Sequence, residues 1–136
     1  MIHKTAIVDS KARVSSSVVI GAYSVIGPNV EIGDNTIIGK NTYLDNQVHI
    51  AHNVKIGDNC IIAGQVGFAG SSELGSHVMI GGQAGISGHL KIGNNVQIGG
   101  GSGVIKDIPD NSKVMGYPAK NLKNFIRENK WYTKQQ

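Results

Sequence analysis

An apolar residue recurs at every sixth position along most of the chain. The series starts at Ile2 and runs through 18 hexads without an insertion. Its members are Ile2, Val8, Val14, Ile20, Ile26, Ile32, Ile38, Leu44, Ile50, Ile56, Ile62, Phe68, Leu74, Ile80, Ile86, Ile92, Ile98 and Val104. A second small or apolar residue stands four places after each of them. Because a period of six does not stay on one face of a helix, the pattern indicates short strands joined by tight corners.

The corners carry their own signal, since asparagine tolerates the positive φ that a tight corner needs. It occupies the same hexad position in Asn29, Asn35, Asn41, Asn53, Asn59 and Asn95. We therefore predict an all-β fold, a parallel β-helix over residues 1–109. Glycine makes up 19 of the 136 residues and aromatic residues only 5%. This composition fits a fold whose coil-to-coil hydrogen bonds leave little need for a core of large side chains.

The repeat stops after Pro109, and residues 110–136 are expected to form an exit loop and a C-terminal α-helix. Leu122, Phe125 and Ile126 have the spacing of one helical stripe, which predicts a helix over residues 119–131. Residues 1–103 carry six basic and six acidic side chains, whereas residues 104–136 carry seven basic and three acidic ones. This excess charge suits contact with an acidic protein, phosphate groups or nucleic acid, and it equally suits a solvated helix end.

The composition also limits the compartment. No apolar run approaches the roughly 18 residues of a membrane span. The single cysteine, Cys60, excludes an internal disulfide framework and fits a reducing environment. From these features we expect a soluble cytoplasmic protein.

The hexad pattern resembles that of the hexapeptide-repeat acyltransferases. In that family a left-handed β-helix has three hexads in each triangular coil of 18 residues, which implies about six coils here. Residues 44–93, with their IAHN and GGQ-x-GI-x-GH motifs, resemble the UDP-3-O-acylglucosamine N-acyltransferases of lipid A biosynthesis. Those enzymes carry a uridine-binding domain ahead of the β-helix, whereas this sequence enters the repeat at Ile2. Residues 116–120, GYPAK, resemble an element that follows the β-helix in acetyl-CoA-dependent sugar acetyltransferases.

This resemblance implies roles for three residues. His52, in IAHN, corresponds to the catalytic base of the family, and Gly70, one coil above it, to the residue whose amide binds the oxyanion. His89, in the GH element, corresponds to a second active-site histidine that binds substrate. The family also uses an acyl carrier protein as donor. Its expected docking residues on the basic tail are Lys120, Lys123, Arg127 and Lys130.

Stacking residues 18 apart sorts the outward side chains into ladders. One ladder has five apolar members in a row, which predicts a subunit interface and, with the family, a homotrimer. Its members are Ile7, Val25, Tyr43, Ile61 and Met79. Another ladder places three glycines above His49, and the adjoining corner places two glycines above His52. We expect the substrate site in this bare slot, lined by His49, Gly67, Gly85, Gly88, Gly103 and Asp34.

The favoured hypothesis is acyl transfer from an acyl carrier protein to the amine of a UDP-linked amino sugar, with no bound cofactor and no metal. The acyl chain would lie along the glycines, and Asp34 is a candidate to orient His52. The first alternative is an acetyl-CoA-dependent sugar acetyltransferase. Further alternatives are a γ-class carbonic anhydrase, which needs three zinc-binding histidines, and a non-catalytic scaffold or nucleic-acid binder that uses the basic tail.

Overall fold

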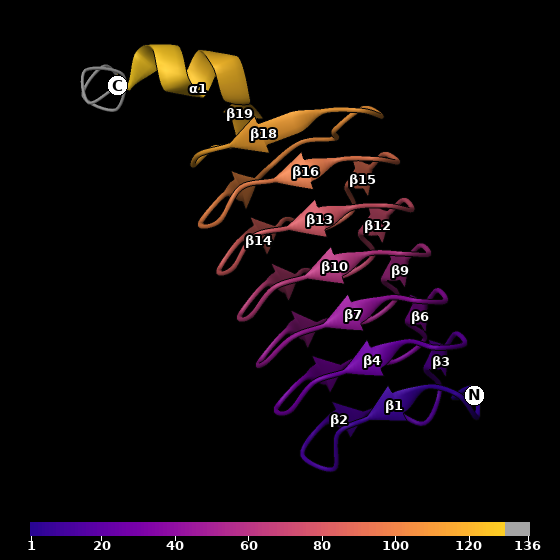
Figure 1. Ribbon diagram of the computed structural model, residues 1–136. Coiled ribbons are helices and arrows are strands. Elements are labelled where there is room, and N and C mark those ends of the chain that lie inside the picture. The colour runs from indigo at the N-terminus through magenta and orange to yellow at the C-terminus, as the bar shows by residue number, and fades with distance from the viewer. Residues whose placement is uncertain (130–136) are drawn as a thin grey trace.

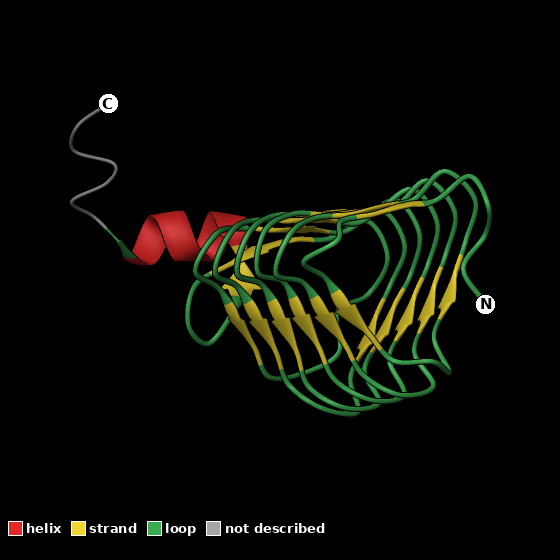
Figure 2. Ribbon diagram, turned by 90° about the horizontal axis from the view of Figure 1, so that it is seen from below, coloured by secondary structure: helices red, strands yellow, loops and turns green. Residues whose placement is uncertain are grey.

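The computed structural model describes residues 1–129. They form a triangular parallel β-solenoid of about six coils with a short helix at its C-terminal end (Figures 1 and 2). Each side of the triangle contributes one two-residue strand per coil, and strands 18 residues apart pair in parallel, as Ile7 does with Val25 and Gly67 with Gly85. The three predicted ladders are therefore three faces of the solenoid.

The faces are named here by their outward side chains. The apolar face contains β1 (Ile7–Val8), β4 (Val25–Ile26), β7 (Tyr43–Leu44), β10 (Ile61–Ile62), β13 (Met79–Ile80), β16 (Gln97–Ile98), β18 (Lys113–Met115) and β19 (Lys120–Asn121). The glycine face contains β2 (Arg13–Val14), β5 (Glu31–Ile32), β8 (His49–Ile50), β11 (Gly67–Phe68), β14 (Gly85–Ile86) and β17 (Gly103–Val104). The charged face contains β3 (Val19–Ile20), β6 (Ile37–Ile38), β9 (Lys55–Ile56), β12 (Glu73–Leu74) and β15 (Lys91–Ile92).

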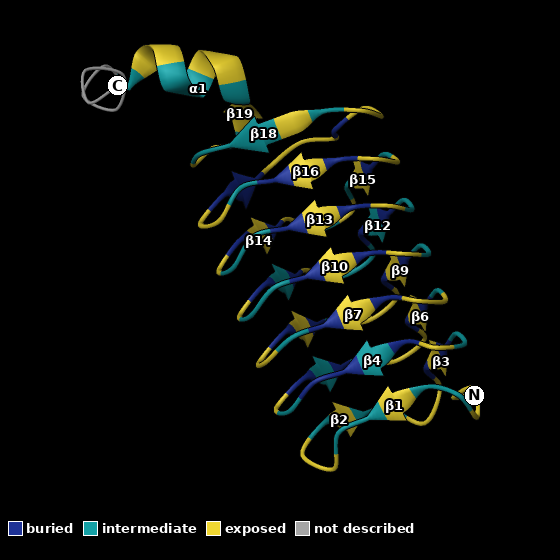
Figure 3. Ribbon diagram, in the orientation of Figure 1, coloured by how far each residue is buried: buried dark blue, intermediate teal, exposed yellow. Residues whose placement is uncertain are grey.

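The core is a column of aliphatic side chains inside the triangle. The second residue of nearly every strand is buried and the first points outward, which gives the alternating colours of the strands in Figure 3. Small polar residues that face inward bond to the backbone at the corners, as Thr36 Oγ1 does to the carbonyl of Ala51 at 2.9 Å. Within residues 1–129 no buried side-chain nitrogen or oxygen lacks a partner. The hexad pattern thus specifies an apolar core, and the buried polar side chains of residues 1–129 are all hydrogen-bonded.

The corners have the geometry that their asparagines predict. All six of these asparagines have positive φ, between 52° and 59°. The same corner position also holds glutamine, serine, tyrosine and histidine at positive φ, including His89 at 61°. Glutamine, serine and tyrosine tolerate this conformation less readily than asparagine does. The repeated corner geometry therefore overrides the local preference of the side chain.

The last coil is shorter than the repeat predicts. Ile108 pairs with Ile92, 16 residues earlier, and Asp107 accepts a hydrogen bond from the Lys91 amide at 2.9 Å. Stacking residues 18 apart would place Lys106 over Gly88, Asp107 over His89 and Pro109 over Lys91, and the structure shows that this stacking is wrong for the last coil. The corner that follows β17 is two residues shorter than the equivalent corners of the other coils. Counting the sequence period does not reveal this, because Ile108 is apolar and buried in either register.

The C-terminal segment also differs from the expectation. β18 extends the apolar face beyond Pro109, and β19 pairs with it in antiparallel. The predicted helix over 119–131 is shorter, because α1 spans Leu122–Glu128, with the Asn121 side chain accepting from the Lys123 amide as N-cap. Leu122, Phe125 and Ile126 are half-buried, and α1 contacts β18 and β19. Residues 130 and 131 lie outside the described residues.

Among residues 1–129, no helix has the length and apolarity needed to cross a lipid bilayer.

Candidate active site

His52 lies at the corner between the glycine face and the charged face, called here the histidine corner (residues 51–54, 69–72 and 87–90). Its side chain is exposed, and its ring lies directly beneath Gly70 of the next coil. A Cβ atom on Gly70 would be only 2.6 Å from Nε2 of His52 and 2.7 Å from Cε1. Any side chain at position 70 would therefore displace the ring. The glycine leaves the space that the imidazole occupies.

The neighbouring residue Asn53 orients this ring. Nδ1 of His52 lies 3.0 Å from Oδ1 of Asn53. An amide oxygen only accepts hydrogen bonds, so this contact favours the tautomer with its proton on Nδ1, in which Nε2 is the nitrogen with the free lone pair. Nε2 is also the ring nitrogen that faces Gly70. The corner therefore presents Nε2 to the coil above. The sequence pattern indicates Asn53 only as a corner residue and does not reveal its contact with the ring.

The backbone amide of Gly70 is available to a ligand. On the corner between the charged and apolar faces, side chains from the coil above accept hydrogen bonds from the backbone amides at the position equivalent to Gly70. Asp58, for example, accepts from the Lys40 amide at 2.9 Å. Above Gly70 stands Gly88, which has no side chain to do this, and the Gly70 amide makes no hydrogen bond within residues 1–129. Gly64 and Gly82 also leave their amides unbonded. Gly70 differs from them in having a histidine ring beside it.

His89 belongs to the same corner, two coils above His52. Its backbone amide donates to the carbonyl of Gly70 at 3.1 Å, so it helps to fix the Gly70 peptide. Its side chain is exposed. A Cβ atom on Gly88 would lie 3.1 Å from that same carbonyl oxygen. The structure thus places His52, Gly70, Gly88 and His89 together in the predicted slot.

Asp34 does not orient His52. It lies one coil below, and its carboxylate accepts from the hydroxyls of Ser15 and Ser17. His49 points outward on the glycine face, where its Nδ1 is 3.4 Å from the Glu31 carboxylate. Glu31 in turn pairs with Arg13. The structure therefore divides the sequence candidates into a corner group around His52 and a ladder of exposed charges that ends at His49.

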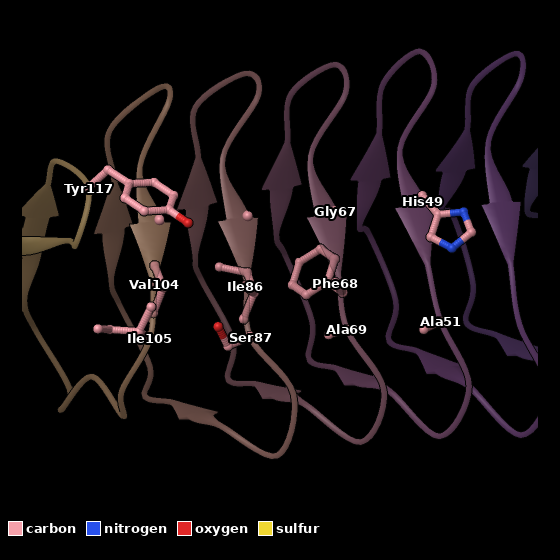
Figure 4. Close-up of a pocket in the computed structure, with 12 residues that line it drawn as sticks. His49, Ala51, Gly67, Phe68, Ala69, Ile86, Ser87, Val104, Ile105 and Tyr117 are labelled. Carbon is pink, nitrogen blue, oxygen red and sulfur yellow. The ribbon is translucent and has the colours of Figure 1, made fainter.

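An open groove of about 470 Å³ runs along the glycine face beside this corner (Figure 4). Its floor is formed by β8, β11, β14 and β17, with His49 at one end and Tyr117 at the other. Ala51 and Ala69, the residues that precede His52 and Gly70, line its edge. The edge of the groove therefore adjoins His52 and Gly70, the two residues that carry the candidate chemistry, although neither of them lines it.

Two of the three predicted floor glycines are bare. A Cβ atom on Gly67 or Gly85 would meet nothing within 4 Å, whereas one on Gly103 would clash with the edge of the Tyr117 ring. Gly103 is buried as a result. The expectation of an open track over all three glycines is therefore wrong. The cause is Tyr117, which follows Gly103 by 14 residues. Stacking residues 18 apart does not predict that its side chain reaches this face.

The remaining candidates lie away from the corner. Lys120 pairs with Glu128, while Lys123 and Arg127 are exposed on α1. Lys130 lies outside the described residues. Cys60 is fully buried, and burial raises the pKa of its thiol, which makes it a core residue rather than a nucleophile. Within residues 1–129 of one chain, no three histidine, cysteine or acidic side chains gather as metal ligands.

Comparison with known proteins agrees with the repeat. The family described as "Bacterial transferase hexapeptide (six repeats)" matches residues 11–44 and 35–70, somewhat less than half of the chain. A search of curated protein sequences finds no significant match. The most informative matches are therefore solved structures.

Three of these structures span 86% of this chain. They are the acetyltransferase domain of PglB from Neisseria gonorrhoeae (24% identity, TM-score 0.84), the perosamine N-acetyltransferase PerB from Caulobacter crescentus (24%, 0.83) and WeeI from Acinetobacter baumannii (29%, 0.83). This chain has the left-handed β-helix fold of the hexapeptide-repeat transferases. It covers only 57%, 56% and 57% of those three chains, respectively. PglB has also been solved with acetyl coenzyme A, and PerB with CoA and GDP-perosamine.

Proposed function

We propose that this protein is an acyltransferase that moves an acyl group from coenzyme A to the amine of a nucleotide-linked sugar. The observation that carries the proposal is the pairing of His52 with Gly70, in which a ring nitrogen lies beside a glycine whose backbone amide makes no hydrogen bond within residues 1–129. Two neighbours in the same fold support the substrate class, since PglB binds acetyl coenzyme A and PerB binds CoA with GDP-perosamine.

The chemistry follows from this pairing. The acceptor amine attacks the thioester carbonyl, so a C–N bond forms and the carbonyl oxygen becomes an oxyanion. Nε2 of His52 takes the proton from the amine, as a histidine does at neutral pH. The Gly70 amide donates a hydrogen bond to the oxyanion. The C–S bond then breaks, and the proton on His52 passes to the leaving thiolate. No covalent enzyme intermediate is needed.

The oligomer is part of the proposal. Ile7, Tyr43, Ile61 and Met79 are 42–65% exposed in a single row on the apolar face, and Val25 lies half-buried among them. A contiguous row of this kind marks an interface. We propose a homotrimer in which these residues are covered and a neighbouring chain completes the open side of the site.

A second candidate donor is an acyl carrier protein, as in the lipid A enzymes that residues 44–93 resemble. The exposed Lys123 and Arg127 on α1 favour it, because a basic surface steers an acidic carrier. Tyr117 opposes a long acyl chain, because its ring covers Gly103.

A donor screen tests the proposal. Acetyl-CoA and a long-chain acyl carrier protein are each incubated with UDP- and GDP-linked amino sugars, and the acylated sugar is detected by mass spectrometry. We expect transfer from acetyl-CoA. Transfer from the carrier protein alone would select the second candidate, and no transfer from either donor would refute the function.

A further inference from the structure

One aromatic side chain stands on the floor at one end of the groove beside His52. Tyr117 stands over Gly103, while the next two floor glycines, Gly85 and Gly67, are open. Gly85 pairs in register with both Gly67 and Gly103, so the three lie in one line along the coil axis. The aromatic ring therefore shortens the straight track along the glycine face by one coil.

The backbone fixes Tyr117 in this position. The Gly103 amide donates to the carbonyl of Gly116 at 2.9 Å, and the Ala119 amide donates to the carbonyl of Gly103 at 2.7 Å. Residues 116–119 thus take the place that the next strand of the glycine face would occupy. Tyr117 lies between the two bonded residues and remains 84% exposed. Its ring covers the floor without being part of the core.

We propose that Tyr117 sets the longest acyl group that the site accepts and makes the protein selective for short donors. This inference rests on the proposed acyl transfer. A carbonyl held at the Gly70 amide lies at the level of Gly67, because both belong to the same coil. The acyl chain then runs along the glycine face toward Gly85 and Tyr117, since His49 stands at the other end of the groove.

The coil spacing gives the length of this track. Adjacent coils are about 4.8 Å apart. An extended hydrocarbon chain advances about 1.3 Å per carbon, given C–C bonds of about 1.5 Å. The step from Gly67 to Gly85 therefore holds about four carbons, on the strand spacing above. An octanoyl group would need about one further coil step, which is where the Tyr117 ring lies.

The test compares acetyl-CoA, butyryl-CoA and octanoyl-CoA as donors for the wild type and for Tyr117→Ala. The acceptor is the nucleotide-linked amino sugar that gives transfer with the wild type. We expect the octanoyl-to-acetyl ratio of kcat/KM to rise at least about tenfold in Tyr117→Ala, which is the discrimination that one methylene gives in an apolar pocket. The readout is the ratio of the two donors, because an acetyl group does not reach the ring and an octanoyl group does.

Two further variants keep the result interpretable. Tyr117→Phe retains the ring and should retain the wild-type ratio. Gly85→Leu fills the track before Tyr117 and should reduce butyryl transfer more than acetyl transfer. Melting temperatures verify that each variant is folded, and the high exposure of Tyr117 predicts no loss there.

The inference and the function fail in different ways. An active wild type whose donor ratio is unchanged in Tyr117→Ala would overturn the role of Tyr117 and leave acyl transfer intact. Equal change in Tyr117→Ala and Tyr117→Phe would also overturn it, because the ring would then not be the barrier. A wild type that transfers none of the three acyl groups would instead refute the proposed function, and the inference with it.

Discussion

Replacing Gly70 with alanine separates the stability of the fold from the geometry of its site. The new Cβ atom would lie 2.6 Å from Nε2 of His52, whereas ordinary contact begins at 3.4 Å. The exposed ring must therefore move by about 1 Å, and a misplacement of that size can cost about 100-fold in rate. We expect turnover in Gly70→Ala to fall by about this factor.

The same substitution should not weaken the fold. Gly70 does not have the positive φ that disfavours alanine, and the atoms it would meet belong to a side chain that can rotate. Exchanging glycine for alanine at such a position stabilises a protein by about 0.4–1 kcal/mol, because the unfolded chain loses freedom. We therefore expect a melting temperature equal to or slightly above that of the wild type.

Gly82→Ala is the matched control. Gly82 lies on the corner between the apolar and glycine faces, at the position within the hexad that Gly70 has on the histidine corner. Its new Cβ atom would come no closer than 3.4 Å to the Gly64 carbonyl. It should gain similar stability and keep full turnover. The assay is acetyl transfer with thermal unfolding of the same samples. If Gly70→Ala turns over as fast as Gly82→Ala, the ring is not held against Gly70 during the reaction and the reasoning fails.

Three other predictions follow from the same structure. Asn53→Gly suits the positive φ of 57° at that position and removes the amide at 3.0 Å from His52, so kcat should fall about tenfold with KM unchanged. Asn53→Asp keeps an acceptor and should restore most of the lost kcat, whereas equal activity in the wild type and both variants would contradict an orienting role. Ile61→Lys with Met79→Lys places two charges in the apolar row and should dissociate the oligomer in sedimentation, while Lys55→Ala on the charged face should leave it unchanged; a native monomer would count against the interface. Cys60, buried with a raised thiol pKa, should resist alkylation at pH 8 until the protein unfolds, and rapid labelling of native protein would disprove its core position.

The sequence determined the coils because the hexad period is carried by residues that point inward on every turn. Ile20, Ile38 and Ile56 must all be buried for the solenoid to form, so their spacing reveals the register. The slot was predictable for the same reason, since Gly70 and Gly88 stack over His52 by counting alone. Stacking by 18 fails where the backbone departs from the repeat, and the two residues missing before Ile108 left no trace in the apolar pattern.

The direction of side chains was the second feature that the sequence could not predict. The preference of asparagine for corners identified Asn53 as a turn residue, but not as the partner of the His52 ring. Counting also placed Asp34 beneath His52 without revealing that Ser15 and Ser17 bind its carboxylate. Tyr117 lies beyond the last predicted hexad, so its position over Gly103 depends on the exit loop, whose backbone no period describes.

The central claim is that His52 removes the proton from the acceptor amine. The most direct test is the turnover of His52→Ala with acetyl-CoA and the accepted amino sugar, in protein whose oligomeric state matches the wild type. His89→Ala, two coils above on the same corner, is the matched control. Loss of a general base costs about 10²–10⁴ in rate, so we expect a loss of that size in His52→Ala and a smaller loss in His89→Ala. Turnover of His52→Ala within about threefold of the wild type, far from that general-base effect, would contradict the account.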